Sequence, residues 1–97
     1  MNDVYVIGVG MTPFRKYLDR TLRSIATEAT TNALNDAHVT PDEIGYTYFS
    51  NAVGGIVTGQ ETIRGQVALR NTGLLGTSIV NVENACASGA SAVHLAW

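Results

Sequence analysis

The sequence predicts an α/β fold in which elements alternate in the order strand, helix, strand, helix, strand, helix. Three short runs are rich in β-branched or aromatic residues, as strands are: residues 4–10, 46–53 and 78–82. After each run, apolar residues recur at steps of three or four, which is the period of an α-helix. Such alternation is typical of a parallel sheet covered by helices, and we predict that architecture.

Composition limits the possible functions of the chain. Its 97 residues suffice for one small domain at most. Eight acidic and six basic residues give a formal charge of −2, and the basic residues are scattered, which disfavours a nucleic-acid partner. A single cysteine excludes an internal disulfide and any multi-thiolate metal site, so we predict no metal.

The hydrophobic segments are too short for the membrane. No apolar run approaches the roughly 20 residues that a membrane-spanning helix needs. The first residues also lack the basic start and apolar core of an ordinary signal peptide. We therefore expect a soluble protein in the cytoplasm or a matrix-like compartment.

Residues 4–10 are almost continuously hydrophobic. A strand covered by helices on both faces has this pattern, so we predict a central strand of the sheet. Gly8 and Gly10 begin a motif similar to the G-x-G-x-x-G of dinucleotide-binding proteins, but Pro13 occupies the third glycine position and no helix follows at once. We predict a tight turn here and no bound cofactor.

The clearest helix begins at Thr21 and ends near His38. Its apolar residues recur with helical spacing: Leu22, Ile25, Ala26, Ala29, Ala33, Leu34 and Ala37. A second helical start follows, with Thr40 as N-cap, Pro41 in the first turn and Glu43 closing a capping box. We expect one short turn of helix there.

The middle of the chain is predicted to form a strand, a loop and a helix. The strand of residues 46–53 is followed by a flexible, glycine-containing loop over 54–60, at the edge where open α/β sheets bind ligands. A helix over 61–71 contains Gly65, which indicates a close packing contact, and Gly73 is its expected C-terminal cap.

The candidate catalytic residue is Cys86. The strand of residues 78–82 leads into a helix over 86–97, which places Cys86 at or just inside the helix N-terminus. Free backbone N–H groups and the helix dipole stabilise a thiolate there, and the thiolate is the nucleophilic form of cysteine. Glu83 is expected to bond backbone in the preceding turn, and Asn84 to cap the helix.

Two segments of this chain resemble known sequences of one family. The segment Asn84-Ala85-Cys86-Ala87-Ser88-Gly89-Ala90-Ser91-Ala92 is similar to the nucleophile segment of thiolases, most of all the sterol-carrier-protein-2-type branch. The opening Val6-Ile7-Gly8-Val9-Gly10-Met11-Thr12-Pro13-Phe14 resembles that branch's first strand and loop. The resemblance runs along the whole chain and implies that residues 1–97 are part of a thiolase N-terminal domain, with the C-terminal half absent.

The resemblance also implies an activity, that of an acetyl-CoA C-acetyltransferase or 3-ketoacyl-CoA thiolase. In such enzymes the cysteine accepts an acyl group from an acyl-CoA as a thioester, and its backbone N–H helps to bind the oxyanion. The acyl group then passes to a carbanion in a Claisen condensation, or the reverse reaction cleaves a 3-ketoacyl-CoA. Coenzyme A thioesters are the expected substrates, and a homodimer or tetramer is the expected assembly.

Thiolase chemistry also needs an acid and a base, and neither histidine of this chain fits that role. His94 follows Cys86 by eight residues on the same predicted helix, about 12 Å along the axis. His38 ends the first helix on a solvated face. Thiolases supply these groups from the C-terminal half, so residues 1–97 alone are predicted to be inactive.

Three alternatives remain open at this point. The chain could belong to a 3-ketoacyl synthase or to a hydroxymethylglutaryl-CoA synthase, which are members of the same superfamily. It could also belong to a non-catalytic lipid carrier or scaffold that keeps the fold. An intact nucleophile segment favours an enzyme.

Overall fold

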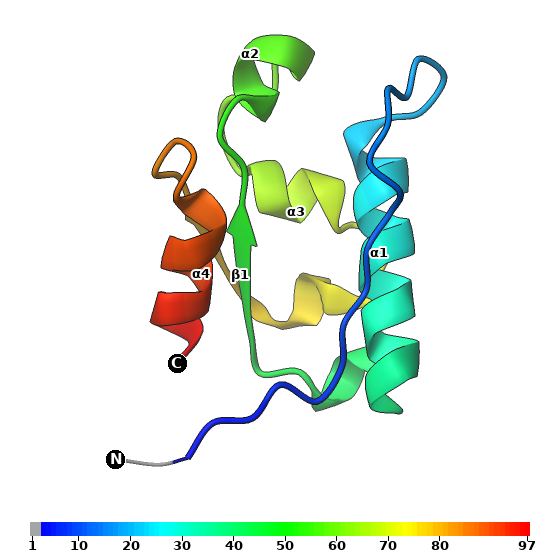
Figure 1. The fold of residues 1–97 in the computed structure, drawn as a ribbon, viewed down its shortest axis with the longest axis vertical. Helices are drawn as coiled ribbons and strands as arrows, with labels where there is room; N and C mark the ends of the chain where they lie inside the picture. Colours follow the sequence, from blue (N-terminus) through cyan, green and yellow to red (C-terminus); the bar gives the residue numbers. More distant parts are fainter. Residues whose placement is uncertain (1–2) are drawn as a thin grey trace.

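The computed structural model describes residues 3–97, which form one parallel strand pair with helices on both sides (Figure 1). The elements are α1 (Leu22–Ala37), β1 (Tyr46–Ser50), α2 (Gly54–Thr58), α3 (Arg64–Ala68), β2 (Ser78–Val82) and α4 (Ser88–Ala96), with 3-10 turns at Pro41–Glu43 and Leu74–Gly76. No helix among these residues is long and apolar enough to cross a membrane.

The two strands pair in parallel, with Tyr46 opposite Ser78 and Ser50 opposite Val82. The α3 helix lies in the connection between them and contacts both strands, while α4 packs against β1 from the other side. The long helix α1 packs on α3, so the order across the molecule is α4, sheet, α3 and α1 (Figure 1). The parallel pairing places the carboxyl ends of β1 and β2 at one edge.

The predicted central strand over residues 4–10 is wrong. This segment is extended but unpaired, and it runs along α1 rather than in the sheet (Figure 1). The two glycines allow the approach, because a Cβ on Gly8 would lie 2.6 Å from the carbonyl oxygen of Ala33. The amide of Val9 donates to the carboxylate of Asp36 at 2.9 Å instead of to a neighbouring strand.

The described chain therefore has two strands, not three. A hydrophobic β-branched run becomes a strand only when another strand meets its backbone groups, and β1 and β2 pair with each other in this chain. The apolar side chains of the segment also stay open to solvent, with Val6 84% exposed.

The first helix is confirmed, as are both of its ends. The Thr21 hydroxyl accepts a hydrogen bond from the Ser24 amide at 3.1 Å, which is the N-cap interaction. His38 ends α1 in the left-handed conformation, with φ 56°. The turn after it is a single 3-10 turn in which the Thr40 amide donates to the Glu43 carboxylate at 2.7 Å.

The loop predicted over 54–60 is instead the short helix α2. The Asn51 side-chain oxygen accepts from the Gly54 amide at 2.5 Å, and the Thr58 hydroxyl donates to the Gly54 carbonyl at 2.6 Å. Gly54 and Gly55 are buried, so these glycines serve close packing. Gly59, with φ 80°, ends the helix.

The helix predicted over 61–71 is shorter, covering Arg64–Ala68. Ile63 adopts a left-handed conformation with φ 43°, which delays the start, and Leu69 already caps the end. Gly73 is therefore not the cap of α3, but precedes the next 3-10 turn with φ 86°. The predicted contact at Gly65 is confirmed, because a Cβ there would lie 2.7 Å from the Cβ of Phe49.

The buried apolar core of residues 3–97 is small. It consists of Ala68, Leu69, Leu74 and Ala92. Large apolar side chains remain on the surface, among them Phe14 at 96% and Trp97 at 70% exposure. Most of the apolar surface of this chain is thus available to other protein.

Candidate active site

The turn that carries Cys86 links the carboxyl end of β2 to the start of α4. The Glu83 carboxylate accepts from the Ala85 amide at 2.6 Å, as predicted for a structural role. The Ala87 amide donates to the Asn84 carbonyl at 2.9 Å. Ala85 has φ 46°, a left-handed conformation that reverses the chain direction here. These bonds fix the backbone on both sides of the cysteine.

Ser88 ties this turn to the helix. Its hydroxyl is buried, donates to the Ala85 carbonyl at 2.7 Å and accepts from the Asn84 amide at 2.8 Å. The sequence patterns did not indicate this role. The available signal was a serine three residues after a turn residue, which is a frequent side-chain to backbone motif.

Asn84 does not cap α4 as predicted, because Ala87 is the N-cap residue. The Asn84 side-chain amide instead donates to the hydroxyl of Ser91 at 3.1 Å. Ser91 lies one turn after Ser88, the first residue of α4. Its backbone N–H and carbonyl are both used within the turn. Asn84 therefore braces the turn against the side of α4.

Cys86 is exposed, and it lies outside the helix, just before the N-cap Ala87. We predicted a position at or just inside the helix, but the structure places Cys86 one residue before the N-cap. Cys86 forms an isolated β-bridge with Asn84, and the neighbouring amides of Ala85 and Ala87 donate to the Glu83 carboxylate and the Asn84 carbonyl. The thiol thus lies on a fixed turn beside the positive end of the α4 dipole.

Neither histidine is built into this site. His94 lies in the last turn of α4 and is exposed, while His38 is the exposed C-cap of α1. Eight residues of chain separate Cys86 from His94. No cluster of three or more potential metal ligands occurs within 3–97.

The small residues of α4 do not all pack closely. Ser88 and Ala92 are buried, but a Cβ on Gly89 would meet no atom within 4 Å among the described residues. Gly89 therefore makes no close packing contact within 3–97.

A cavity of about 200 Å³ lies beside the turn, at the carboxyl ends of the strands. It is lined by Ala52, Gly55, Ile56, Glu61, Arg64 and Glu83. This is the edge where ligand binding was predicted, and α2 forms part of its wall. Glu83 of the turn lines the cavity, but Cys86 does not.

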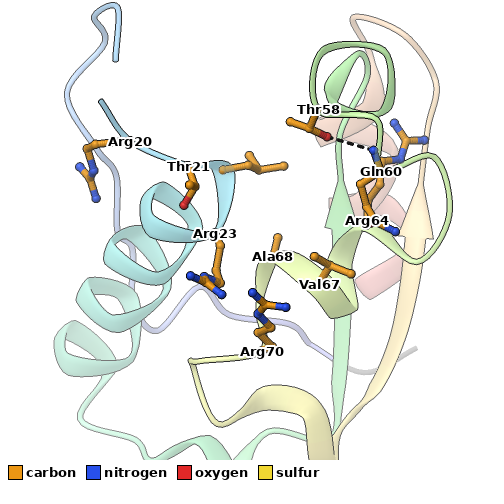
Figure 2. Close-up of a pocket in the computed structure, with 10 residues that line it drawn as sticks. Arg20, Thr21, Arg23, Thr58, Gln60, Arg64, Val67, Ala68 and Arg70 are labelled. Carbon is orange, nitrogen blue, oxygen red and sulfur yellow. Dashed lines mark hydrogen bonds between the residues drawn. The ribbon is translucent and has the colours of Figure 1, made fainter. Parts of the chain in front are cut away.

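A larger cavity of about 380 Å³ lies elsewhere, between the start of α1 and the α2–α3 segment (Figure 2). Its walls contain four arginines, and no residue of the Cys86 turn lines it. The sequence patterns gave no indication of it, because the arginines come from segments about 40 residues apart. Arg64 lines both this cavity and the 200 Å³ cavity beside the turn.

Comparison with known proteins identifies the family. The family described as "Thiolase, N-terminal domain" matches residues 4–97. Acetyl-CoA acetyltransferase of Methanocaldococcus jannaschii is 36% identical over 99% of this chain and 24% of its own length. Human sterol carrier protein 2 is also 36% identical, over 99% of this chain and 17% of its own length.

Other relatives extend the comparison. The benzoylsuccinyl-CoA thiolase subunit BbsB of Thauera aromatica is 36% identical over 96% of this chain. The crystal structure of 3-oxoacyl-[acyl-carrier-protein] synthase III from Aquifex aeolicus has the same fold, with a TM-score of 0.70, 20% identity and coverage of 92% of this chain and 28% of that chain. The chain spans about a quarter or less of the curated relatives it matches. It belongs to the thiolase family and corresponds to the N-terminal domain.

Proposed function

We propose that the protein containing these residues is an acyl-CoA acyltransferase of the thiolase type, with Cys86 as the acyl-accepting nucleophile. The observation that carries the proposal is the exposed Cys86, held on a braced turn at the start of α4. Membership of the thiolase family and the names of its acetyltransferase relatives support it.

The proposed first step is transfer of the acyl group to Cys86. The thiolate attacks the carbonyl carbon of an acyl-CoA, and the carbonyl oxygen becomes an oxyanion. The bond to the coenzyme A sulfur then breaks, that sulfur takes up a proton, and a thioester remains on Cys86. The Cys86 amide is suited to stabilise the oxyanion, because hydrogen bonds of the residues on both sides fix its position.

In the second step the acyl group leaves Cys86. A carbanion formed at the α-carbon of a second acyl-CoA attacks the thioester carbonyl, a carbon–carbon bond forms, and the Cys86 thiolate is released. The reverse sequence is thiolysis of a 3-ketoacyl-CoA. Both directions need a base that removes a proton and an acid that returns it. The positions of His38 and His94 support the view that other parts of the whole protein supply these groups.

Thiolysis of acetoacetyl-CoA by the whole protein tests the proposal. We expect turnover that falls at least ~10³-fold in Cys86→Ala, because removal of a nucleophile abolishes the covalent path. Lys16→Ala serves as a control that changes an exposed residue outside the turn. Equal turnover in wild type and Cys86→Ala would contradict the assigned role.

Two alternatives share the fold. The structural likeness to 3-oxoacyl-[acyl-carrier-protein] synthase III concerns the fold, and a synthase of that kind would use an acyl carrier protein as acceptor. A carrier without turnover is suggested by the names of the sterol carrier protein relatives. Assays with acetyl-CoA, with malonyl-loaded acyl carrier protein and with no acceptor would separate the three cases.

We further propose that the whole protein is a homodimer or tetramer with β2 near the subunit contact. The support is the two-stranded sheet, in which β2 has an unpaired edge within residues 3–97. Proteins seldom leave such an edge uncovered. Light scattering at micromolar concentration is expected to give a dimer or larger, and a fully active monomer would contradict this proposal.

A further inference from the structure

Glu83 is the first residue after β2 and lies three residues before Cys86. Its side chain is exposed, and its carboxylate accepts a hydrogen bond from the Ala85 amide at 2.6 Å. The ion pair found among residues 3–97 joins Arg20 to Glu28, so no cation within them holds the Glu83 carboxylate. The contact that engages this carboxylate is therefore a backbone group of the turn that carries the cysteine.

Ala85 needs support because of its backbone conformation. Its φ of 46° is left-handed, a region in which the Cβ of an L-residue crowds the following carbonyl oxygen. The other non-glycine residues of 3–97 with positive φ, His38 and Ile63, are cap residues of helices. Ala85 is the one that adjoins Cys86. A charge-assisted hydrogen bond to its amide offsets the cost of this conformation.

Two peptide planes meet at the Cα of Ala85, and a side chain holds each of them. The Glu83 carboxylate holds the plane that contains the Ala85 amide, and the buried Ser88 hydroxyl donates to the Ala85 carbonyl at 2.7 Å in the other plane. The second plane also contains the Cys86 amide, because a carbonyl and the following amide are coplanar. The angle between the two planes thus sets the direction in which the chain enters Cys86.

The charge of Glu83 does not itself favour a nucleophile at Cys86. A negative charge close to a thiol opposes formation of the thiolate. The contribution of Glu83 must then come from its acceptor oxygen, which binds the Ala85 amide. The two effects are separable, because a glutamine keeps an acceptor oxygen and carries no charge.

We propose that Glu83 is a positioning residue for acyl transfer to Cys86. Its carboxylate holds the Ala85 amide, the left-handed Ala85 directs the chain toward α4, and the Cys86 sulfur is thereby placed for attack on the acyl group. A misplacement of about 1 Å can slow a reaction by about a hundredfold. This inference rests on the proposed acyltransferase function and adds to it a residue that acts through the backbone.

Single-turnover acetylation of the whole protein by acetyl-CoA tests the proposal. The thioester on the Cys86 peptide is measured by mass spectrometry at increasing acetyl-CoA concentrations. We expect Glu83→Ala to lower the maximal rate by about tenfold or more and to leave the half-saturating concentration unchanged, because the sulfur moves and the substrate-binding groups do not. Asp19→Ala, which removes an exposed carboxylate outside the turn, should acetylate as wild type does.

A second background shows whether Glu83 acts through Ala85. Glycine adopts left-handed conformations without steric cost, so Ala85→Gly removes the need for support. Glu83→Ala should therefore slow acetylation by less than about threefold in the Ala85→Gly background, against about tenfold in the wild-type background. Glu83→Gln should be faster than Glu83→Ala, because an acceptor oxygen remains. Equal slowing in both backgrounds, or a Glu83→Gln protein as slow as Glu83→Ala, would overturn the proposal.

Two further measurements separate positioning from loss of folding and from the acyltransferase proposal. The melting temperature of Glu83→Ala should stay close to that of wild type, and slowing that matches the unfolded fraction would overturn the proposal. Cys86→Ala is run beside it. No thioester in Cys86→Ala together with a wild-type rate in Glu83→Ala would overturn the positioning proposal alone. Acetylation of Cys86→Ala equal to that of wild type, or none in wild type, would overturn both.

Discussion

At the scale of single residues, hydrogen bonds fix the backbone of the turn before α4. The amides of Asn84, Ala85 and Ala87 have acceptors within the turn or on Ser88. Cys86 forms an isolated β-bridge with Asn84, and its side chain is exposed. A group whose position is already fixed needs little reorganisation when charge develops near it. The neighbours of Cys86 thus hold the proposed nucleophile in place.

Ser88 is the residue whose removal should disturb this arrangement most. Ser88→Ala leaves the Asn84 amide and the Ala85 carbonyl without their buried partner, so we expect a loss of about 1–3 kcal/mol in the free energy of unfolding. Lys16→Ala, at an exposed position, should change it by less than about 0.5 kcal/mol. Urea unfolding of the whole protein measures both. Equal effects of the two substitutions would show that Ser88 does not fix the turn.

At the scale of elements, the crossing of α3 over the strands depends on Gly65. Its amide donates to the Asn81 side-chain oxygen of β2 at 2.5 Å, and its missing side chain leaves room for Phe49 of β1. The Asn81 side chain also donates to Gln66 at 2.8 Å. One glycine and one asparagine therefore hold α3 against both strands.

Gly65→Ala should force these contacts apart. The added Cβ would lie 2.7 Å from Phe49 and 2.8 Å from Asn81, so we expect destabilisation of about 1–3 kcal/mol. Gly76→Ala is the matched control, because an added Cβ there meets no atom within 4 Å among the described residues. Thermal unfolding compares the two variants. A Gly65→Ala protein as stable as Gly76→Ala would contradict the close contact.

Elements with local signals were predictable from the sequence, and those that depend on distant partners were not. The cap at Thr21, the left-handed end at His38 and the strand at Ser78–Val82 follow from nearby residues. Residues 4–10 have strand composition, but their partner in space is α1, which no local pattern reveals. Helix α2 likewise depends on the Asn51 side chain, and α3 is shortened by the backbone of Ile63.

The candidate site follows the same division. The identity of Cys86 and the structural role of Glu83 were predicted, because both follow from a short motif. The one-residue offset of Cys86 from the helix and the bracing by Ser88 depend on side-chain to backbone bonds. The arginine cavity joins α1 to the end of α3, and the scattered basic residues gave no sign of it.

At the scale of the whole molecule, residues 3–97 bury few apolar side chains and expose many. Four apolar residues form the buried core, whereas Val93 and Leu95 of α4 and its C-cap Trp97 are all more than half exposed. Apolar surface of this extent usually contacts other protein. The chain spans about a quarter or less of the length of these relatives.

Residues 1–97 expressed alone are therefore predicted to show no thiolase activity. Their two histidines lie at exposed helix ends, so neither supplies an acid or base beside the thiol. The exposed apolar surface should also make the isolated piece aggregate. The test compares thiolysis of acetoacetyl-CoA by residues 1–97 and by the whole protein. Turnover by the piece that disappears in Cys86→Ala would show that the base lies within it.

The central claim is that Cys86 carries the acyl group, and mass spectrometry tests it most directly. The whole protein is mixed with acetyl-CoA without acceptor, quenched in acid and digested, and the peptide containing Cys86 is examined for an acetyl thioester. We predict the adduct on Cys86 in wild type, its release by hydroxylamine, and its absence in Cys86→Ala. An acetyl group that appears on another residue, or that forms equally in Cys86→Ala, would contradict the account.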